Sequence, residues 1–210
     1  MIPADLLNRY ENLILGADRA FQKIEREYPQ EVLCRIGCSD CCHALFGLFL
    51  IEAAYIKGHF EGLDRKERRE VLARCVRMNR DLERFQKNVG PGMETGSPTP
   101  DILGKARIRC PLLDDEKRCV LYPSRPLTCR VYGIPTRIRG KARVCGKAGF
   151  NQGRSYPAFN LDEAQQILFL LSREWLIRLG TENPGKASLL ISLARALESP
   201  LDEILRECYV

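Results

Sequence analysis

The chain has 210 residues, of which 45% are hydrophobic and 29% charged, and its formal net charge is +6. This composition is typical of an ordinary soluble globular protein. No apolar run approaches the ~18 residues that a membrane helix needs, and the N-terminus lacks the basic and apolar regions of a signal peptide. We therefore expect a cytoplasmic protein that does not associate with membranes.

Three helices are expected in the first half of the chain. Residues 3–30 place apolar side chains at helical spacing between charged ones, which predicts an amphipathic helix. A second helix is expected over about 48–59. A third is expected over about 64–88, with Asp64 as its N-cap. The next segment, 89–100, contains three Gly and three Pro and is predicted to be a loop or linker.

The second half begins without a helical period. Residues 101–160 are rich in Pro, Gly, Arg and Cys, and short strands are expected at 130–135 and 137–144. The second of these strands is predicted to form a hairpin around Gly140. Helices are predicted again at 161–179, 184–198 and 201–208.

These elements predict a mainly α fold, in which a helical scaffold surrounds an irregular cysteine-rich segment with at most a short β-hairpin. We expect residues 1–160 to form the cysteine-rich domain and residues 161–210 to supply C-terminal helices that pack on it. A segment of this length without its own period needs something else to hold it, and bound metal is the natural candidate.

Ten cysteines are present, and eight of them fall into two clusters. In a reducing cytosol, dense cysteine indicates metal binding or redox chemistry rather than structural disulfides. The other two, Cys75 and Cys208, are expected to be small buried hydrophobes. The predicted metal ligands are Cys34, Cys38, Cys41 and Cys42 in the first group, and Cys110, Cys119, Cys129 and Cys145 in the second.

The spacing of the first group favours a shared centre. Cys34, Cys38 and Cys41 follow one another at i, i+4 and i+7, which places three thiols on one side of a helix or of a loop that continues one. Cys42 is one residue further along and so points about 100° away in a helix. It is expected to reach either a second metal or another part of the same cluster.

The second group lies in the most basic part of the chain. Between residues 105 and 147 there are twelve Lys or Arg and three acidic residues, a local charge of +9 that leaves −3 for the remainder. Nearby cations favour the thiolate form that binds metal, and Arg125 and Arg130 are predicted to donate hydrogen bonds to a bound centre. A solvated basic face and a nucleic-acid patch are the alternatives.

The order of these motifs resembles a known family. Cys34-x3-Cys38-x2-Cys41-Cys42 precedes Cys110-Pro-Leu-Leu, and then Cys119-x2-Tyr-x2-Arg-Pro-x2-Cys129-Arg. This pattern is similar to the CxxCxxCC cysteine-cluster family, described as a zinc- or iron-chelating domain, although three residues rather than two separate its first two cysteines. The resemblance implies metal binding by all eight cysteines. The domain also occurs in proteins resembling flagellin lysine N-methylases, which implies methyl transfer as one activity.

The metal itself is left open by the sequence. Zinc would use the eight thiols as two tetrahedral four-cysteine sites, whereas a 4Fe–4S cluster would use four of them as its ligands. The adjacent Cys41 and Cys42 suit a polynuclear cluster better than one tetrahedral ion, so we prefer iron–sulfur. The first three cysteines also have radical SAM spacing, but Asp40 replaces the usual aromatic and no strand–helix repeats follow. His43 is expected to be a surface side chain.

The sequence is therefore compatible with three functions. The first is a metal-binding protein without an assigned reaction. The second is a cluster-dependent methyltransferase or redox enzyme. The third is a zinc-stabilised module that binds nucleic acid through the basic segment, which we do not favour. The sequence leaves the protein or small-molecule partner undetermined.

Overall fold

The computed structural model describes residues 1–35, 37–89 and 106–209, without the side chains of residues 89 and 207–209. It is mainly helical with one small three-stranded sheet, as the sequence predicts. Apart from Val89, the linker predicted at 89–100 lies outside the described residues. Cys208 lies beyond the described side chains.

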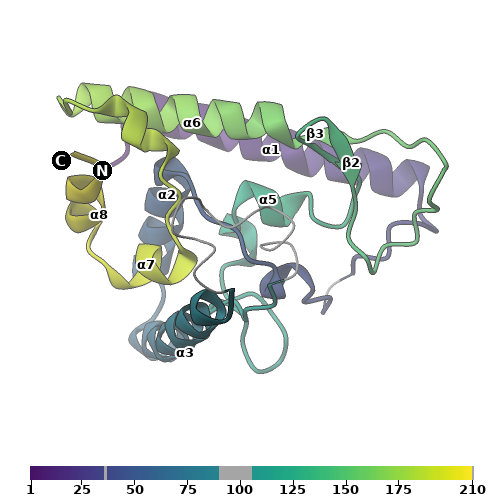
Figure 1. Cartoon of the computed structure of the whole chain (residues 1–210), viewed down its shortest axis with the longest axis horizontal. Coiled ribbons are helices and arrows are strands. Elements are labelled where there is room, and N and C mark those ends of the chain that lie inside the picture. Colours follow the sequence, from purple (N-terminus) through teal and green to yellow (C-terminus); the bar gives the residue numbers. More distant parts are fainter. Residues whose placement is uncertain (36, 90–105, 210) are drawn as a thin grey trace.

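Two long helices form one side of the molecule (Figure 1). Helices α1 (Ala4–Glu27) and α6 (Leu161–Arg178) run side by side in opposite directions. At one end of the pair, Arg178 of α6 forms a salt bridge of 2.6 Å with Asp5 of α1. The predicted first helix is confirmed, although it ends at Glu27 because the chain turns before Pro29.

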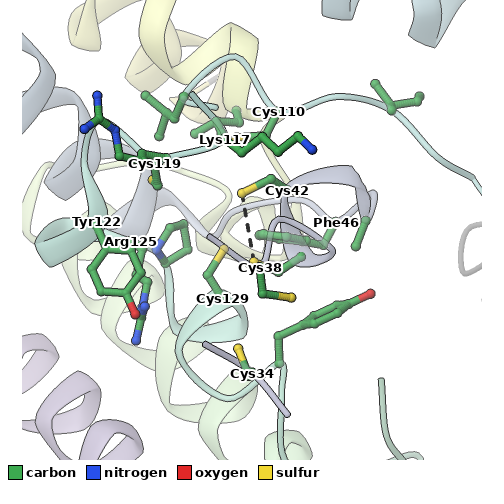
Figure 2. A pocket seen from close by; sticks show the side chains of 18 of the residues that line it. Cys34, Cys38, Cys42, Phe46, Cys110, Lys117, Cys119, Tyr122, Arg125 and Cys129 are labelled. Carbon is green, nitrogen blue, oxygen red and sulfur yellow. Dashed lines mark hydrogen bonds between the residues drawn. The ribbon is translucent and has the colours of Figure 1, made fainter. Parts of the chain in front are cut away.

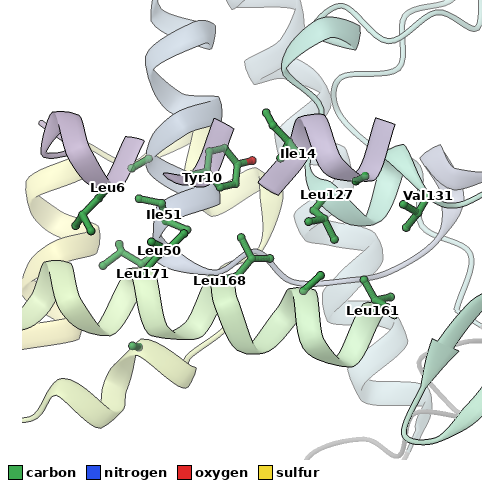
Figure 3. Packing of buried hydrophobic residues seen from close by; sticks show 14 of the residues in the cluster. Leu6, Tyr10, Ile14, Leu50, Ile51, Leu127, Val131, Leu161, Leu168 and Leu171 are labelled. Carbon is green, nitrogen blue, oxygen red and sulfur yellow. The ribbon is translucent and has the colours of Figure 1, made fainter. Parts of the chain in front are cut away.

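Helix α2 (Leu50–Glu61) lies between this pair and α3 (Arg65–Val89). It contributes to two hydrophobic clusters, because both of its faces are covered. Asp64 accepts a hydrogen bond from the backbone N–H of Glu67 at 2.8 Å, which confirms it as an N-terminal cap of α3. The first cluster, which joins α1, α2 and α6, contains Leu6, Tyr10, Ile14, Leu50, Ile51, Leu127, Val131, Leu161, Leu168 and Leu171 (Figure 3).

The second cluster joins α2, α3 and the C-terminal helix α7 (Leu193–Glu198). Cys75 of α3 is fully buried in this cluster, as expected for a small apolar side chain. The last helix, α8 (Leu201–Tyr209), contributes Ile204 to the first cluster. Both clusters therefore draw on residues before and after position 160, and the division into domains at that point stays a prediction.

The prediction of a single helix over residues 184–198 is wrong. A short 3₁₀ helix (Pro184–Ser188) is followed by an extended stretch before α7 begins. In that stretch, Ile191 exchanges two backbone hydrogen bonds with Leu48, at 2.8 and 2.9 Å. Ser192 then caps α7 by accepting from the N–H of Arg195 at 3.1 Å. Pairing with a distant segment therefore outweighs local helical preference here.

The predicted hairpin is confirmed, but its neighbouring strand is not. Strands β1 (Thr136–Ile138) and β2 (Lys141–Arg143) pair in antiparallel fashion around Arg139 and Gly140, which both have positive φ. A third strand, β3 (Phe159–Asn160), pairs in parallel with β1 and was not predicted.

The strand predicted at 130–135 is wrong, because the chain there forms a turn of helix and then bends. Helix α5 (Leu127–Arg130) follows Pro126, which serves as its N-cap residue. After the helix, Ile134 donates a backbone hydrogen bond to the carbonyl of Val131, so this stretch is a turn. Both ends of the segment are held by tertiary contacts that the local sequence pattern does not reveal.

Candidate metal centre

Seven of the eight predicted ligands line one cavity of about 310 Å³ (Figure 2). The two groups of the sequence are not separate in space, because members of both face this cavity. Cys34 also packs against the first hydrophobic cluster, whereas Cys110 and Cys119 pack against the second. The cavity therefore lies where the two cores meet. Its cysteines are Cys34, Cys38, Cys41, Cys42, Cys110, Cys119 and Cys129.

Backbone pairing brings the two groups together. Cys110 donates its N–H to the carbonyl of Cys42 at 2.7 Å, and Ile108 donates to the carbonyl of His43 at 3.1 Å. A second pairing, in which Val120 donates to the carbonyl of Leu112 at 2.9 Å, folds the chain back beside this segment. These contacts position Cys42, Cys110 and Cys119 around one part of the cavity.

Cys129 is positioned by the short helix α5. The buried carboxylate of Glu52, in α2, accepts a hydrogen bond of 3.0 Å from the N–H of Leu127 and one of 3.3 Å from Phe49. At the other end of α5, Arg130 donates to Asp18 of α1 at 2.5 Å. Burial raises the pKa of Glu52 to about 7. Helices α1 and α2 therefore both hold the element that carries Cys129.

Cys34 is fitted against a glycine. A Cβ atom added at Gly133 would lie 2.5 Å from the Cβ of Cys34 and 3.2 Å from its sulfur. Any larger residue at this position would displace Cys34, because carbon atoms in contact are normally about 3.5–4.0 Å apart. The close approach of these two segments therefore requires glycine.

Cys41 and Cys42 lie in a 3₁₀ helix (Cys41–His43) with their sulfurs 4.0 Å apart. Two thiolates on one zinc ion, each at 2.3 Å in a tetrahedron, would be about 3.8 Å apart. The hydrogen bond between the two sulfurs lowers the pKa of Cys41 to about 7, and the same bond, together with burial, raises the pKa of Cys42. Cys41 and Cys42 therefore line the same cavity, and whether Cys42 reaches a second metal or another part of one cluster stays a prediction.

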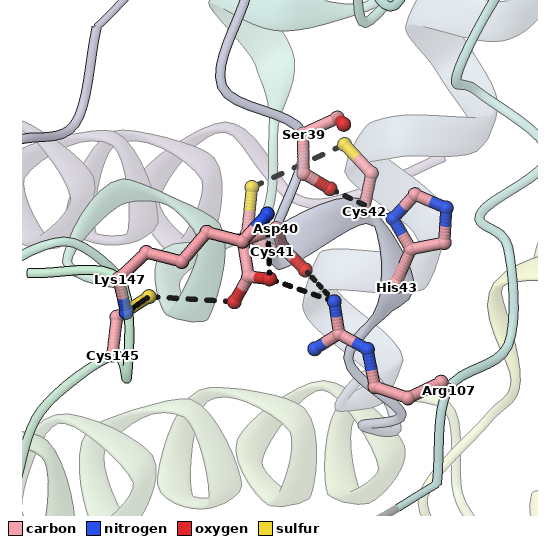
Figure 4. Close-up of polar contacts among 8 residues, drawn as sticks. All are labelled: Ser39, Asp40, Cys41, Cys42, His43, Arg107, Cys145 and Lys147. Atoms are coloured by element: carbon pink, nitrogen blue, oxygen red, sulfur yellow. Dashed lines mark hydrogen bonds and ion pairs between the residues drawn. The ribbon is translucent and has the colours of Figure 1, made fainter.

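Cys145 lies beside the main cavity, in a second cavity of about 20 Å³ that Cys34, Cys38 and Cys41 also line. Its thiol donates to Asp40 at 3.3 Å, and Asp40 also accepts from Arg107 at 2.7 Å (Figure 4). Although partial burial acts in the opposite direction, the hydrogen bonds from Arg107 and Cys145 hold the pKa of Asp40 below its usual value.

The donor set fits a metal centre that takes thiolates. Burial raises the pKa of Cys110 to about 12 and of Cys34 to about 11, so these thiols are protonated near neutral pH until a metal displaces the protons. Among the described residues, no three Cys, His, Asp or Glu side chains already form a metal-binding group. Seven sulfurs around one cavity nevertheless exceed the four that one zinc ion takes.

The two predicted cofactor-binding arginines have different positions. Arg125 lines the main cavity and stacks on Tyr122, with its guanidinium carbon 4.0 Å from the ring centre. Arg130 is buried and does not line the cavity; it donates to Asp18 and to backbone carbonyls, including that of Pro123 at 2.6 Å. His43 is half-buried, with Nδ1 2.9 Å from the carbonyl oxygen of Ser39.

Much of the local positive charge is already paired. Asp18 pairs with both Arg125 and Arg130, and Asp40 pairs with both Arg107 and Lys147. Two further cations, Arg109 and Arg118, pair with the acidic residues 114–116. At least six of the twelve basic residues of this segment therefore have a carboxylate partner, and those of the hairpin 137–143 are exposed.

The sequence interpretation missed three residues that shape the site. Asp40 could have been found from the sequence, because it is an acidic residue that directly precedes Cys41. Glu52 gave only a weak signal, as an acidic residue within an apolar helix. Gly133 lies in the segment 130–135, for which the sequence predicts a strand. Its role depends on the approach of Cys34, about 100 residues earlier in the chain, which no local pattern reports.

A helical scaffold that gathers clustered thiols around one cavity is the architecture of a cysteine-cluster domain. The family model CxxCxxCC, described as "putative zinc- or iron-chelating domain", matches residues 33–146, more than half of the chain. The chain therefore belongs to this family. No curated protein and no solved structure matches it. In the part of the chain that is described, no helix has the length and apolar character needed to span a bilayer.

Proposed function

We propose that the protein is a metalloprotein that holds two adjoining centres through its eight clustered cysteines. The observation that carries this proposal is the distribution of the thiols over two neighbouring cavities. The proposed ligands are Cys42, Cys110, Cys119 and Cys129 for the larger cavity, and Cys34, Cys38, Cys41 and Cys145 for the smaller one.

The lining residues support this division. The four thiols assigned to the larger cavity line only that cavity, and Cys145 lines only the smaller one. Cys34, Cys38 and Cys41 line both and are assigned to the smaller cavity, where they complete a set of four with Cys145. The division crosses the two groups of the sequence and separates the adjacent Cys41 and Cys42, whose sulfurs lie 4.0 Å apart.

The sizes of the cavities favour different occupants. A volume of about 310 Å³ gives room for a polynuclear cluster, and four thiolates are the ligand set of a 4Fe–4S centre. The smaller cavity, about 20 Å³, holds roughly one water-sized group, so it suits a single zinc or iron ion with four thiolates. When bound, an iron–sulfur cluster would supply electron transfer, and the second ion would hold the surrounding chain.

The surrounding cations support the same proposal. Four thiolates on a cluster core of charge about +2 leave a net charge of about −2. Arg125 lines the larger cavity and pairs only loosely with Asp18, at 3.9 Å, so its charge can offset this excess. Arg130 acts differently, because it holds α5 and therefore the position of Cys129.

The division is tested by comparing Cys110→Ser with Cys145→Ser after anaerobic purification. We expect Cys110→Ser to lose iron, sulfide and visible absorption while keeping about one metal ion. Cys145→Ser should keep the absorption and lose that ion. Cys75→Ala, in the core, is the matched control and should keep both. Simultaneous loss of both centres from each variant, with a folded helical core, would contradict the division.

An enzymatic role remains the second candidate, because the larger cavity has room beside a cluster. A redox or methyl-transfer reaction would require a substrate to bind in that cavity. Binding of S-adenosylmethionine to the fully loaded protein, measured by calorimetry, would support methyl transfer, and its absence would contradict it. A nucleic-acid module finds less support, since many of the basic side chains are paired with carboxylates.

A further inference from the structure

The larger cavity has a wall that metal ligation does not use. Apolar side chains from four separate parts of the chain form this wall: Phe46 before α2, Met78 of α3, Leu112 in the segment 106–126, and Leu193 of α7. None of its lining residues is Asp or Glu. The thiols of the cavity suit a metal, whereas an apolar wall of this extent is typical of a site that binds an organic molecule.

A cation stands beside this wall. Lys117 lines the cavity from the turn between Leu113 and Cys119, which pair across an isolated bridge. Its backbone has φ of 60°, the left-handed conformation that ends this tight turn. The three acidic residues of the turn, 114–116, pair with Arg109 and Arg118 instead.

The other cations that line the cavity already have carboxylate partners. Arg35 pairs with Glu25 at 3.6 Å, and Arg125, which pairs loosely with Asp18 at 3.9 Å, is already assigned to the charge of the proposed metal centre. Within residues 1–35, 37–89 and 106–209, Lys117 has no such partner. It is therefore the lining cation most available to an anion that enters from solvent.

We propose that the cavity binds a small organic anion, with an apolar body against the wall formed by Phe46, Met78, Leu112 and Leu193 and its charged group on Lys117. The shared chemistry of the ligand is an aliphatic or aromatic body that carries one carboxylate or one phosphate. The inference rests on the proposed function in one respect, since the metal centre is taken to occupy the thiol-lined part.

The arrangement in space supports a single ligand that reaches both features. Figure 2 shows Lys117 and Phe46 on the same side of the cysteines, with Tyr122 and Arg125 on the opposite side. The cavity volume of about 310 Å³ lies at the lower end of the roughly 300–1,000 Å³ of small-molecule sites. With a metal centre present, the remaining room is smaller, which favours a short chain of about six carbons or fewer.

The test titrates metal-loaded protein with hexanoate, hexyl phosphate and hexan-1-ol by calorimetry, after metal content has been measured. We expect one or both anions to bind at least tenfold more tightly than the alcohol. Lys117→Met should remove that preference without changing the affinity for hexan-1-ol, and Phe46→Ala should weaken binding of every probe. Lys141→Met, on the exposed strand β2, is the matched control and should bind like the wild type.

The two anions distinguish the sources of the charged group, because preference for hexanoate indicates a carboxylate and preference for hexyl phosphate indicates a phosphate. Equal affinity for anions and alcohol, an unchanged preference in Lys117→Met, or no binding to fully loaded protein would overturn the inference. If Lys117 only neutralises the metal centre, its substitution will change metal content and leave probe binding unchanged, which also overturns it. Absence of metal from the wild type would instead contradict the proposed function.

Discussion

Gly133→Ala is the most direct test of how the fold positions a predicted ligand. The new methyl group would lie 2.5 Å from the Cβ of Cys34, 3.2 Å from its sulfur and 3.3 Å from the ring of Phe21. Since carbon atoms in contact are about 3.5–4.0 Å apart, the Cβ atoms must separate by about 1.0–1.5 Å. A Cβ is fixed to its backbone, so rotation of the cysteine side chain cannot relieve the clash.

The cost of such overpacking is about 1–3 kcal/mol. Displacement of Cys34 would transfer part of this cost to metal affinity, and 1–3 kcal/mol corresponds to roughly 5- to 150-fold in a dissociation constant. We expect Gly133→Ala to lower the metal affinity of the smaller site and the free energy of unfolding together. Competition with a chromophoric chelator measures the first quantity, and urea unfolding measures the second.

Gly146→Ala is the matched control, because it lies beside Cys145 and a Cβ there would meet nothing within 4 Å. This variant should keep both the metal affinity and the unfolding free energy of the wild type. If Gly133→Ala behaves like Gly146→Ala in both measurements, then the fit between Gly133 and Cys34 does not hold the ligand, and the reasoning fails.

Three further predictions concern the scaffold. Removing metal with a chelator should abolish amide-exchange protection in residues 106–149, because these residues have little regular structure of their own, and should leave α1 protected. Unchanged protection in residues 106–149 would contradict a structural role for the metal. Because the pKa of Glu52 is raised to about 7, its contribution to stability is full below about pH 4.5 and is lost as pH rises through 7. In urea unfolding, the free energy of unfolding should therefore fall between these pH values by at most about 1.4 kcal/mol per pH unit, and Glu52→Gln should remove this fall. An equal slope in both proteins would refute this. Asp18→Ala should lower the free energy of unfolding by about 2–3 kcal/mol, because it leaves the buried Arg130 without its carboxylate partner. The loss is smaller than for a fully enclosed pair, since Asp18 is 29% exposed. A melting temperature within one degree of the wild type would contradict this prediction.

The helical scaffold could be predicted because its signals are local. The period of α1, the cap at Asp64 and the turn at Gly140 depend on residues close together in the sequence, and each is confirmed. The helix predicted over 184–198 failed because Ile191 pairs with Leu48, more than 140 residues away. A preference that is weak locally was decided there by tertiary pairing.

The clustered cysteines could be predicted as candidate metal ligands from their spacing, but their arrangement in space could not. Sequence distance grouped Cys145 with Cys110, whereas in space Cys145 lies beside Cys34 and Asp40. The contacts that decide this, such as the approach of Gly133 to Cys34, join segments about 100 residues apart. Periodicity and motif spacing carry no information about such contacts.

Elemental analysis of anaerobically purified wild-type protein decides whether the clustered cysteines bind metal in two centres. Iron, zinc and acid-labile sulfide should be measured per chain together with the visible absorption spectrum. We expect about four iron and four sulfide with a broad charge-transfer band, and one further zinc or iron ion. Protein that is folded, fully reduced and free of metal would contradict this expectation.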